Sequence, residues 1–187
     1  MRKQPEVTER TKAALRDAFW ELYAGDGAAP GLAPERISVR AITERAGYNR
    51  ATFYLYYRDV YDLLGQIEDE VLADARDVIA RLLASEGDLD FSTHMGAIAE
   101  CAARSSRYFG KLMGEAGDPA FVGRLKQLVR PLVERYFVEG RGLSDAEADL
   151  ICEFYLSGIM AVVSRWLTDC PEMPISQLID LIVRSVL

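Results

Sequence analysis

Apolar residues recur three or four positions apart in almost every stretch of this chain, and no stretch alternates apolar and polar residues between turn signals. The first spacing places side chains on one face of an α-helix, whereas alternation is typical of a half-buried β-strand. The sequence therefore predicts an all-α fold of eight or nine helices and no sheet.

Residues suited to helix capping stand before several of these stretches, where side-chain oxygens can accept hydrogen bonds from the first free backbone amides. The expected capping residues are Ser38, Asn49, Asp59, Asp90, Asp118 and Ser144. Pro119 suits the first helical position after Asp118, and Glu147 completes a capping box with Ser144. Pro131 lies inside a helical stretch and is expected to kink it, because proline has no backbone amide hydrogen.

Composition excludes several classes of protein. Of the 187 residues, 50% are hydrophobic and 27% are charged, which is the balance of a soluble globular chain. Three widely spaced cysteines and a single histidine provide neither a disulfide framework nor a multi-histidine metal site. No secretory signal follows the N-terminal charges, and no apolar run approaches the roughly 20 residues of a transmembrane helix. We therefore expect a cytoplasmic protein with no membrane partner, no metal and no cofactor.

Charge is distributed unevenly along the chain. The net charge is −7, but residues 1–60 carry ten basic and eight acidic side chains, whereas residues 61–187 carry twelve and twenty-one. The N-terminal third is thus mildly basic and the remainder is acidic, a pattern compatible with phosphate contacts at one end of the chain. Charge alone does not identify such a partner.

The most specific motif lies in residues 37–64, with the sequence ISVRAITERAGYNRATFYLYYRDVYDLL. It predicts two short helices joined by a turn centred on Gly47, which is the layout of a helix-turn-helix. A single α-helix fits the major groove of DNA, where base edges differ in their hydrogen-bonding groups. Pairs of short helices with a glycine turn also occur in proteins that never bind DNA.

Helical geometry assigns the side chains of the second short helix to two faces. Phe53 and Tyr57 lie four residues apart and are expected to point inward with Tyr48, as packing residues. On the outer face, Arg50 can donate two hydrogen bonds to guanine, and the small Ala51 permits close approach to the bases. Asn49 can either contact a base edge or cap the helix. Hydroxyl groups suited to phosphate oxygens belong to Thr52, Tyr54 and Tyr56.

Residues 8–64 resemble the DNA-binding domain of TetR-family transcriptional repressors. The similarity covers an amphipathic first helix, then I-S-V-R-A-I-T-E-R-A-G, Y-N-R-A-T-F-Y-L-Y-Y and R-D-V-Y-D-L-L. The resemblance implies that residues 49–52 face bases. Leu55 lacks a tyrosine hydroxyl common in the family, and Val60 replaces a common lysine, whose charge Arg58 is expected to supply. The expected DNA-binding residues are Ser38, Arg40, Asn49, Arg50, Ala51, Thr52, Tyr54, Tyr56 and Arg58.

The resemblance also implies two domains, a DNA-binding domain over residues 1–58 and a ligand-binding and dimerisation domain over residues 59–187. Residues 105–125 look like a C-terminal region found in some family members. The loop over residues 25–36 is longer than is usual in the family.

Two apolar stripes near the C-terminus are expected to form the interface of a homodimer, because a helix-turn-helix protein reads a palindrome with two copies of its recognition helix. The alternative is that both stripes belong to the core of one chain. The residues of the stripes are Ile151, Phe154, Tyr155, Gly158, Val162, Trp166, Ile175, Leu178, Ile179 and Ile182.

The middle helices carry apolar residues that are either core or, as the resemblance implies, the lining of a pocket for an apolar or aromatic effector. The candidate ligand-binding residues are Met95, Ile98, Cys101, Tyr108, Met113, Phe121 and Leu125. His94 is interpreted as a surface or capping residue rather than a ligand-binding one.

Two functions remain open. The first is a TetR-like homodimeric transcriptional regulator, expected to be a repressor, which binds a palindromic operator in double-stranded DNA and is released by a small-molecule effector. The second is an all-α small-molecule carrier or protein adaptor that has lost DNA binding, which the acidic total charge, Leu55 and Val60 favour. No paired nucleophile and base, glycine-rich phosphate loop or metal-ligand spacing occurs, so we do not expect an enzyme.

Overall fold

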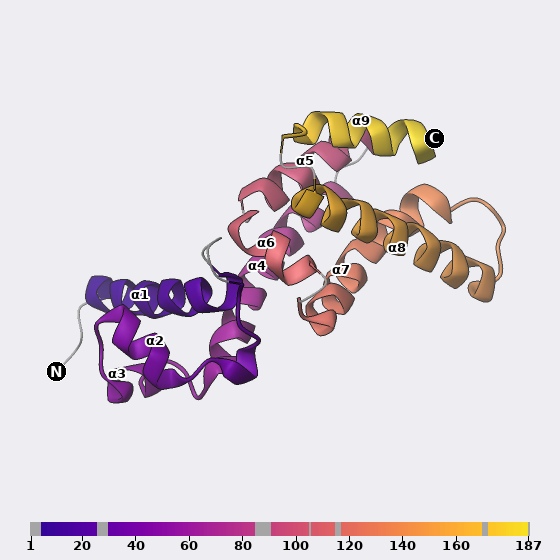
Figure 1. The fold of residues 1–187 in the computed structure, drawn as a ribbon. Coiled ribbons are helices and arrows are strands. Elements are labelled where there is room, and N and C mark those ends of the chain that lie inside the picture. Colours follow the sequence, from indigo (N-terminus) through magenta and orange to yellow (C-terminus); the bar gives the residue numbers. More distant parts are fainter. Residues whose placement is uncertain are drawn as a thin grey trace. The chain divides into compact units, whose positions relative to one another are not determined.

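The computed structural model describes residues 5–25, 30–84, 91–104, 106–114, 117–169 and 172–186. Over these ranges the chain forms nine α-helices and one short 3-10 helix, with no β-strand (Figure 1). The predicted all-α fold class is therefore confirmed. The helices divide between two compact units, residues 1–70 and residues 71–187.

The first unit contains α1 (Pro5–Ala24), the 3-10 helix η1 (Pro34–Arg36), α2 (Val39–Ala46), α3 (Arg50–Tyr54) and the first part of α4 (Val60–Ala84). Helix α2 packs against both α1 and α3. The side chains of the core are buried on the faces that helical spacing predicts, and they include Leu15, Phe19, Tyr23, Ile42, Phe53, Tyr57, Leu63 and Ile67.

An ion pair joins the two long helices of this unit. Both terminal nitrogens of Arg16 on α1 donate to the carboxylate of Glu70 on α4, at 2.6 and 2.5 Å. Paired, parallel bonds of this kind fix geometry as well as charge. They hold α1 against α4 at the edge of the aromatic core.

The second unit contains the rest of α4 and five further helices. These are α5 (Phe91–Arg104), α6 (Ser106–Met113), α7 (Pro119–Phe137), α8 (Asp145–Asp169) and α9 (Ile175–Val186). Helix α8 packs against α6 and α7, and α9 packs against α5 (Figure 1). Helix α7 continues as one helix on both sides of Pro131.

Two expected caps of this unit are present. The Asp118 carboxylate accepts a hydrogen bond from the Ala120 amide at 2.8 Å at the start of α7. At the start of α8 the Ser144 amide donates to the Glu147 carboxylate at 2.9 Å, and the Glu147 amide donates to the Ser144 hydroxyl oxygen at 3.4 Å. The Ser144 hydroxyl also donates to the Glu147 carboxylate at 2.7 Å, and this bond together with the one from the Ser144 amide holds the pKa of Glu147 below its ordinary value. The expected cap Asp90 lies outside the described residues.

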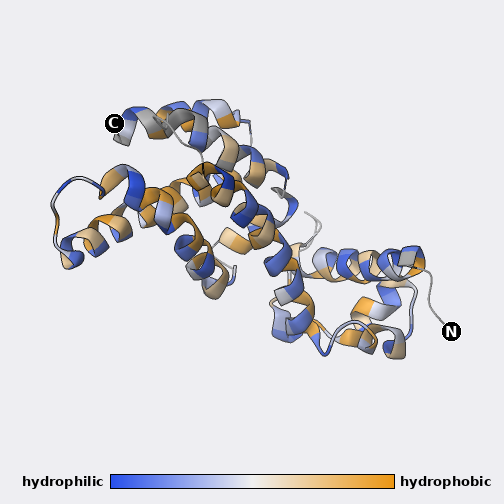
Figure 2. Cartoon of the chain, turned by 180° about the vertical axis from the view of Figure 1, so that it is seen from behind, coloured by the Kyte–Doolittle hydropathy of each residue, from blue (hydrophilic) through white to orange (hydrophobic). Residues whose placement is uncertain are grey.

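Helix α8 differs from the sequence expectation. Its segment Asp145–Leu167 is long and apolar enough to cross a membrane by length and composition, although the sequence shows no uninterrupted apolar run of that length. A few charged residues interrupt the run without removing its apolar character. Figure 2 shows apolar residues along this helix, and only 22% of its most apolar window is buried within the chain. A single such helix is a weak indication of a membrane protein, because the core helix of a soluble protein can have the same length and composition.

Candidate functional site

The turn between α2 and α3 depends on the backbone of Gly47. This residue ends α2 with a φ of 73° and a ψ of 29°, in the left-handed region where a side chain is unfavourable. The next amide, of Tyr48, donates to the Thr43 carbonyl at 2.9 Å and closes the end of α2. The sequence Ala-Gly-Tyr-Asn therefore reverses the chain within a few residues and starts α3 beside α2.

Both short helices of this pair begin with capping residues that the sequence predicts. The Ser38 hydroxyl accepts from the Ala41 amide at 3.1 Å. Asn49 accepts from the Thr52 amide at 2.8 Å and from the Thr52 hydroxyl at 3.1 Å. Of the two roles left open for Asn49, the structure thus shows the cap. The Thr52 hydroxyl, which is expected to bond a phosphate oxygen, donates instead to the Asn49 side chain.

The side chains of α3 divide between a buried and an exposed face. Phe53 is fully buried and Tyr57, just beyond the helix, is 2% exposed. On the opposite face Arg50 and Ala51 are exposed, and the side chain of Tyr54 is 52% exposed. A cation, a small residue and a hydroxyl therefore share the solvent face of α3, as the sequence predicts.

The basic residues that flank α3 already have acidic partners. Arg40 pairs with Glu44 at 2.7 Å, and Arg58 pairs with Asp62 at 3.2 Å. Both arginine side chains are largely exposed, so each ion pair contributes little to the stability of the fold.

The start of α4 is stabilised by its own acidic residues. The Asp62 amide donates to the Asp59 carboxylate at 2.8 Å, which confirms Asp59 as a capping residue. The Arg58 amide donates to Asp62 at 2.9 Å and lowers the pKa of that carboxyl from its ordinary value. The turn that carries Arg58 is therefore held to the first turn of α4.

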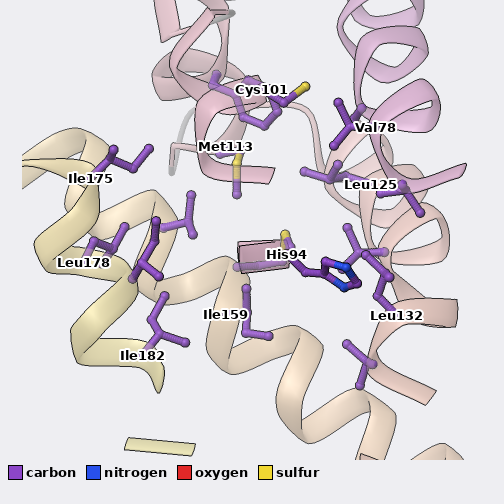
Figure 3. A pocket seen from close by; sticks show the side chains of 18 of the residues that line it. Val78, His94, Cys101, Met113, Leu125, Leu132, Ile159, Ile175, Leu178 and Ile182 are labelled. Atoms are coloured by element: carbon purple, nitrogen blue, oxygen red, sulfur yellow. The ribbon is translucent and has the colours of Figure 1, made fainter. Parts of the chain in front are cut away.

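A second candidate site lies within the second unit. It is a cavity of about 90 Å³ among α4, α5, α6, α7, α8 and α9. Of the predicted ligand-binding residues, Cys101, Met113 and Leu125 line it (Figure 3). The side chains of Met95 and Ile98 lie outside those that the structure describes.

Two other predicted ligand-binding residues lie elsewhere. Phe121 is fully buried and packs edge-on against Phe109 at a centroid distance of 6.1 Å, but it does not line the cavity. Tyr108 is half-buried beneath the guanidinium of Arg107, which lies 5.6 Å from its ring centroid. Helical spacing groups these two residues with the predicted lining, but in the structure neither of them lines the cavity.

The interpretation of His94 as a surface or capping residue is wrong. His94 is 6% exposed, lines the cavity, and shares a hydrogen bond between its Nδ1 and the hydroxyl of Tyr136 on α7. Sequence reasoning missed it because a lone histidine has no fixed preference for a helix face. The usable signal was spacing, since His94 precedes Cys101 by seven residues and so shares its face.

The residues predicted for a dimer interface fall into three groups by exposure. On α8, Gly158 is exposed, Phe154 is 72% exposed and Val162 is 41% exposed. On α9, three members are buried inside the chain and line the cavity, namely Leu178, Ile179 and Ile182. The remaining members are half-buried: Ile151, Tyr155, Trp166 and Ile175. The apolar surface that remains open to a partner therefore lies mainly on α8.

Within the described ranges, no three His, Cys, Asp or Glu side chains gather where they could hold a metal ion. The two features that remain are the exposed face of α3 and the apolar cavity.

A TetR family model, described as a transcriptional regulator C-terminal region, matches residues 90–186, which is just over half of the chain. The chain therefore belongs to the TetR family of transcriptional regulators. No curated protein matches the chain in sequence.

Solved structures share the fold over nearly the whole chain. A TetR transcriptional regulator from Streptococcus agalactiae 2603V aligns with a TM-score of 0.66 at 19% identity, over 97% of this chain and 96% of its own. The fatty acid degradation regulator FadR from Bacillus halodurans aligns with a TM-score of 0.63 at 14% identity, over 98% and 95%. FadR from Thermus thermophilus, a TetR family transcriptional repressor in complex with lauroyl-CoA, has a TM-score of 0.53 at 18% identity, over 92% and 91%.

Proposed function

We propose that this regulator acts as a homodimer that binds a palindromic operator in double-stranded DNA, represses transcription there, and is released by a small apolar or aromatic effector. In this proposal residues 1–58 bind DNA, and residues 59–187 bind the effector and form the dimer. The proposed location is the cytoplasm.

The observation that carries the proposal is the exposed face of α3. Arg50, Ala51 and Tyr54 are open to solvent, while Phe53 anchors the same helix in the core. A short helix anchored on one side and polar on the other can enter a major groove without rearranging its own domain. The capping bond to Asn49 keeps its first turn regular.

Flanking groups supply the phosphate contacts in this proposal. Arg40 and Arg58 would exchange their exposed carboxylate partners for phosphates, and the Tyr54 and Tyr56 hydroxyls would donate to phosphate oxygens. Ser38 and Asn49 contribute chiefly by capping their helices, since their side-chain oxygens are occupied there.

The exposed apolar face of α8 supports the homodimer. Large exposed apolar residues gathered on one helix mark an interaction surface more often than a solvated one. Phe154, Gly158 and Val162 recur four residues apart, so they lie on one stripe of α8. Exposed Gly158 would permit two copies of the helix to approach closely around a two-fold axis.

The cavity supports the proposal that a small-molecule effector binds to the second unit. It lies among helices of the second unit, and its lining is almost entirely aliphatic, aromatic or sulfur-containing. The T. thermophilus neighbour was solved with lauroyl-CoA, which illustrates an apolar chain as one kind of ligand for this fold.

Selection of bound fragments from a random pool of double-stranded DNA tests the DNA-binding proposal. We expect recovery of an inverted repeat, and we expect its affinity to fall steeply with salt as counterions are released from phosphates. Recovery of no common sequence, with retention on DNA that salt does not alter, would contradict the proposal. That result would favour the carrier or adaptor function instead.

A further inference from the structure

We infer that the cavity binds a small, uncharged and mostly apolar molecule. The molecule carries one hydrogen-bonding group, and this group bonds to the His94–Tyr136 pair. This inference rests on the proposed effector function and adds the chemical class of the effector and the residues that orient it.

The size of the cavity limits the apolar part of the ligand. The cavity measures about 90 Å³, whereas an engineered cavity of about 150 Å³ lined by Leu, Ile and Phe stays dry and binds benzene. The ligand is therefore about as large as one ring or a short branched chain, with slight outward movement of the lining side chains. A longer chain would require a larger rearrangement of the packed helices.

The lining also selects against charge. None of the described residues that line the cavity is an aspartate, glutamate, lysine or arginine. An ion buried in such surroundings has no partner of opposite charge, and its transfer from water costs far more than the apolar contacts return. A neutral ligand carries no such penalty.

Two residues of this lining, His94 and Tyr136, form a hydrogen-bonded pair. The Tyr136 hydroxyl and His94 Nδ1 bond to each other, and their rings meet edge-on with centroids 5.9 Å apart. Figure 3 shows the nitrogen atoms of the His94 ring among the carbon and sulfur atoms of the other labelled side chains. The indole of Trp166, another lining residue, instead donates to the Met173 carbonyl at 2.9 Å.

This pair suits a third polar atom. A tyrosine hydroxyl both donates and accepts, and a neutral imidazole donates from one nitrogen and accepts at the other. A ligand hydroxyl can therefore join the bond as donor or acceptor without leaving a buried group unsatisfied. Apolar pockets typically orient ligands with a few such groups, because an aliphatic wall excludes water but does not fix direction.

Benzene, phenol and benzoate test the inference, because they share a ring and differ in polarity and charge. Their dissociation constants would be measured by calorimetry, and the His94 ring signals by NMR on 15N-labelled protein. The chain has one histidine, so these signals need no assignment. We expect phenol to bind about 5-fold more tightly than benzene and to shift the His94 ring signals more than benzene does. Benzoate should bind most weakly of the three.

Two variants separate the hydrogen bond from packing. Tyr136→Phe should remove the advantage of phenol over benzene and leave benzene binding within about 2-fold. Tyr61→Phe makes the same chemical change at an exposed residue outside the cavity and should retain the full advantage. If Tyr136→Phe fails to fold, the measurements on the unmodified protein still decide.

Three results would overturn the inference: no binding of benzene or phenol, equal affinities with unchanged His94 signals, or benzoate binding as tight as phenol binding. Retention of the selected DNA would be measured on the same samples. Loss of ligand binding with intact DNA retention contradicts this inference alone, whereas absence of DNA retention contradicts the proposed function.

Discussion

At the residue scale, the exposed face of α3 would make two kinds of DNA contact in the proposed complex. The guanidinium of Arg50 can match the two acceptors of guanine, so it carries information about sequence. The hydroxyl of Tyr54 can reach only groups present at every position, such as phosphate oxygens. Their effects on binding should therefore differ in kind.

Arg50→Ala should relax base preference at one operator position by about 1–3 kcal/mol, whereas Tyr54→Phe should weaken binding to all sequences alike. Fluorescence anisotropy with the selected operator and its single-base variants measures both effects. The assignment of Arg50 fails if the alanine variant keeps the full preference at every position.

The buried hydroxyl of Tyr57 should make the fold less stable at high pH. Burial raises the pKa of its hydroxyl from 10.0 to about 12. Above pH 10 the unfolded chain loses this proton while the folded chain keeps it, so the free energy of unfolding is undiminished below about pH 10 and falls by about 2 kcal/mol as the pH rises to about 12.

Urea denaturation at about pH 9 and about pH 11.5 checks the sign for Tyr57. Tyr57→Phe keeps the buried ring and removes this titration, so the variant should lose less stability than the unmodified chain between the two values. The other eight tyrosines titrate in both proteins. Equal losses would show that Tyr57 ionises as easily in the folded state as in the unfolded one.

At the element scale, the helix pair depends on a backbone conformation as much as on side-chain packing. Gly47 ends α2 with positive φ, and a Cβ added there would meet no atom within 4 Å. The cost of a side chain at this turn is therefore conformational rather than steric against a neighbour. Gly123, inside α7, is exposed and equally open, but there the backbone is helical.

Two Gly→Ala substitutions should thus have opposite effects on the free energy of unfolding. Gly47→Ala should lower it by about 1–2 kcal/mol, because alanine is strained in the left-handed region. Gly123→Ala should raise it by up to about 1 kcal/mol through helix propensity. Chemical denaturation measures both, and stabilisation by both would refute the account of the turn.

At the scale of the whole molecule, the proposed dimer interface on α8 can be tested with two valines of similar exposure, one on α8 and one on α1. Val162 on α8 is 41% exposed and Val7 on α1 is 53% exposed. In the proposed homodimer only Val162 becomes buried, and a two-fold axis brings both copies of it into one interface.

Val162→Asp should therefore raise the dimer dissociation constant at least about 100-fold. Each of the two copies loses about 1.5 kcal/mol of free energy from apolar burial, and each adds a charge to the interface. Val7→Asp should leave it unchanged. Sedimentation equilibrium measures both, and an unweakened Val162→Asp dimer would place the interface elsewhere.

Local features of the fold could be predicted from the sequence alone. The helical spacing, the caps at Ser38, Asn49 and Asp118, and the turn at Gly47 all depend on residues within about four positions of one another. The separation of Phe53 from Arg50 likewise follows from the period of the helix. Such interactions are encoded in adjacent sequence and need no knowledge of distant segments.

Only the tertiary structure decided which neighbour covers each apolar face. Helical spacing identifies Leu178 and Phe154 equally well as members of apolar stripes, yet the first is buried in a cavity and the second is 72% exposed. His94 and Tyr136 are 42 residues apart and meet because α5 and α7 both border the same cavity. The period of a helix defines a face, whereas the partner of that face depends on how all the helices fill space together.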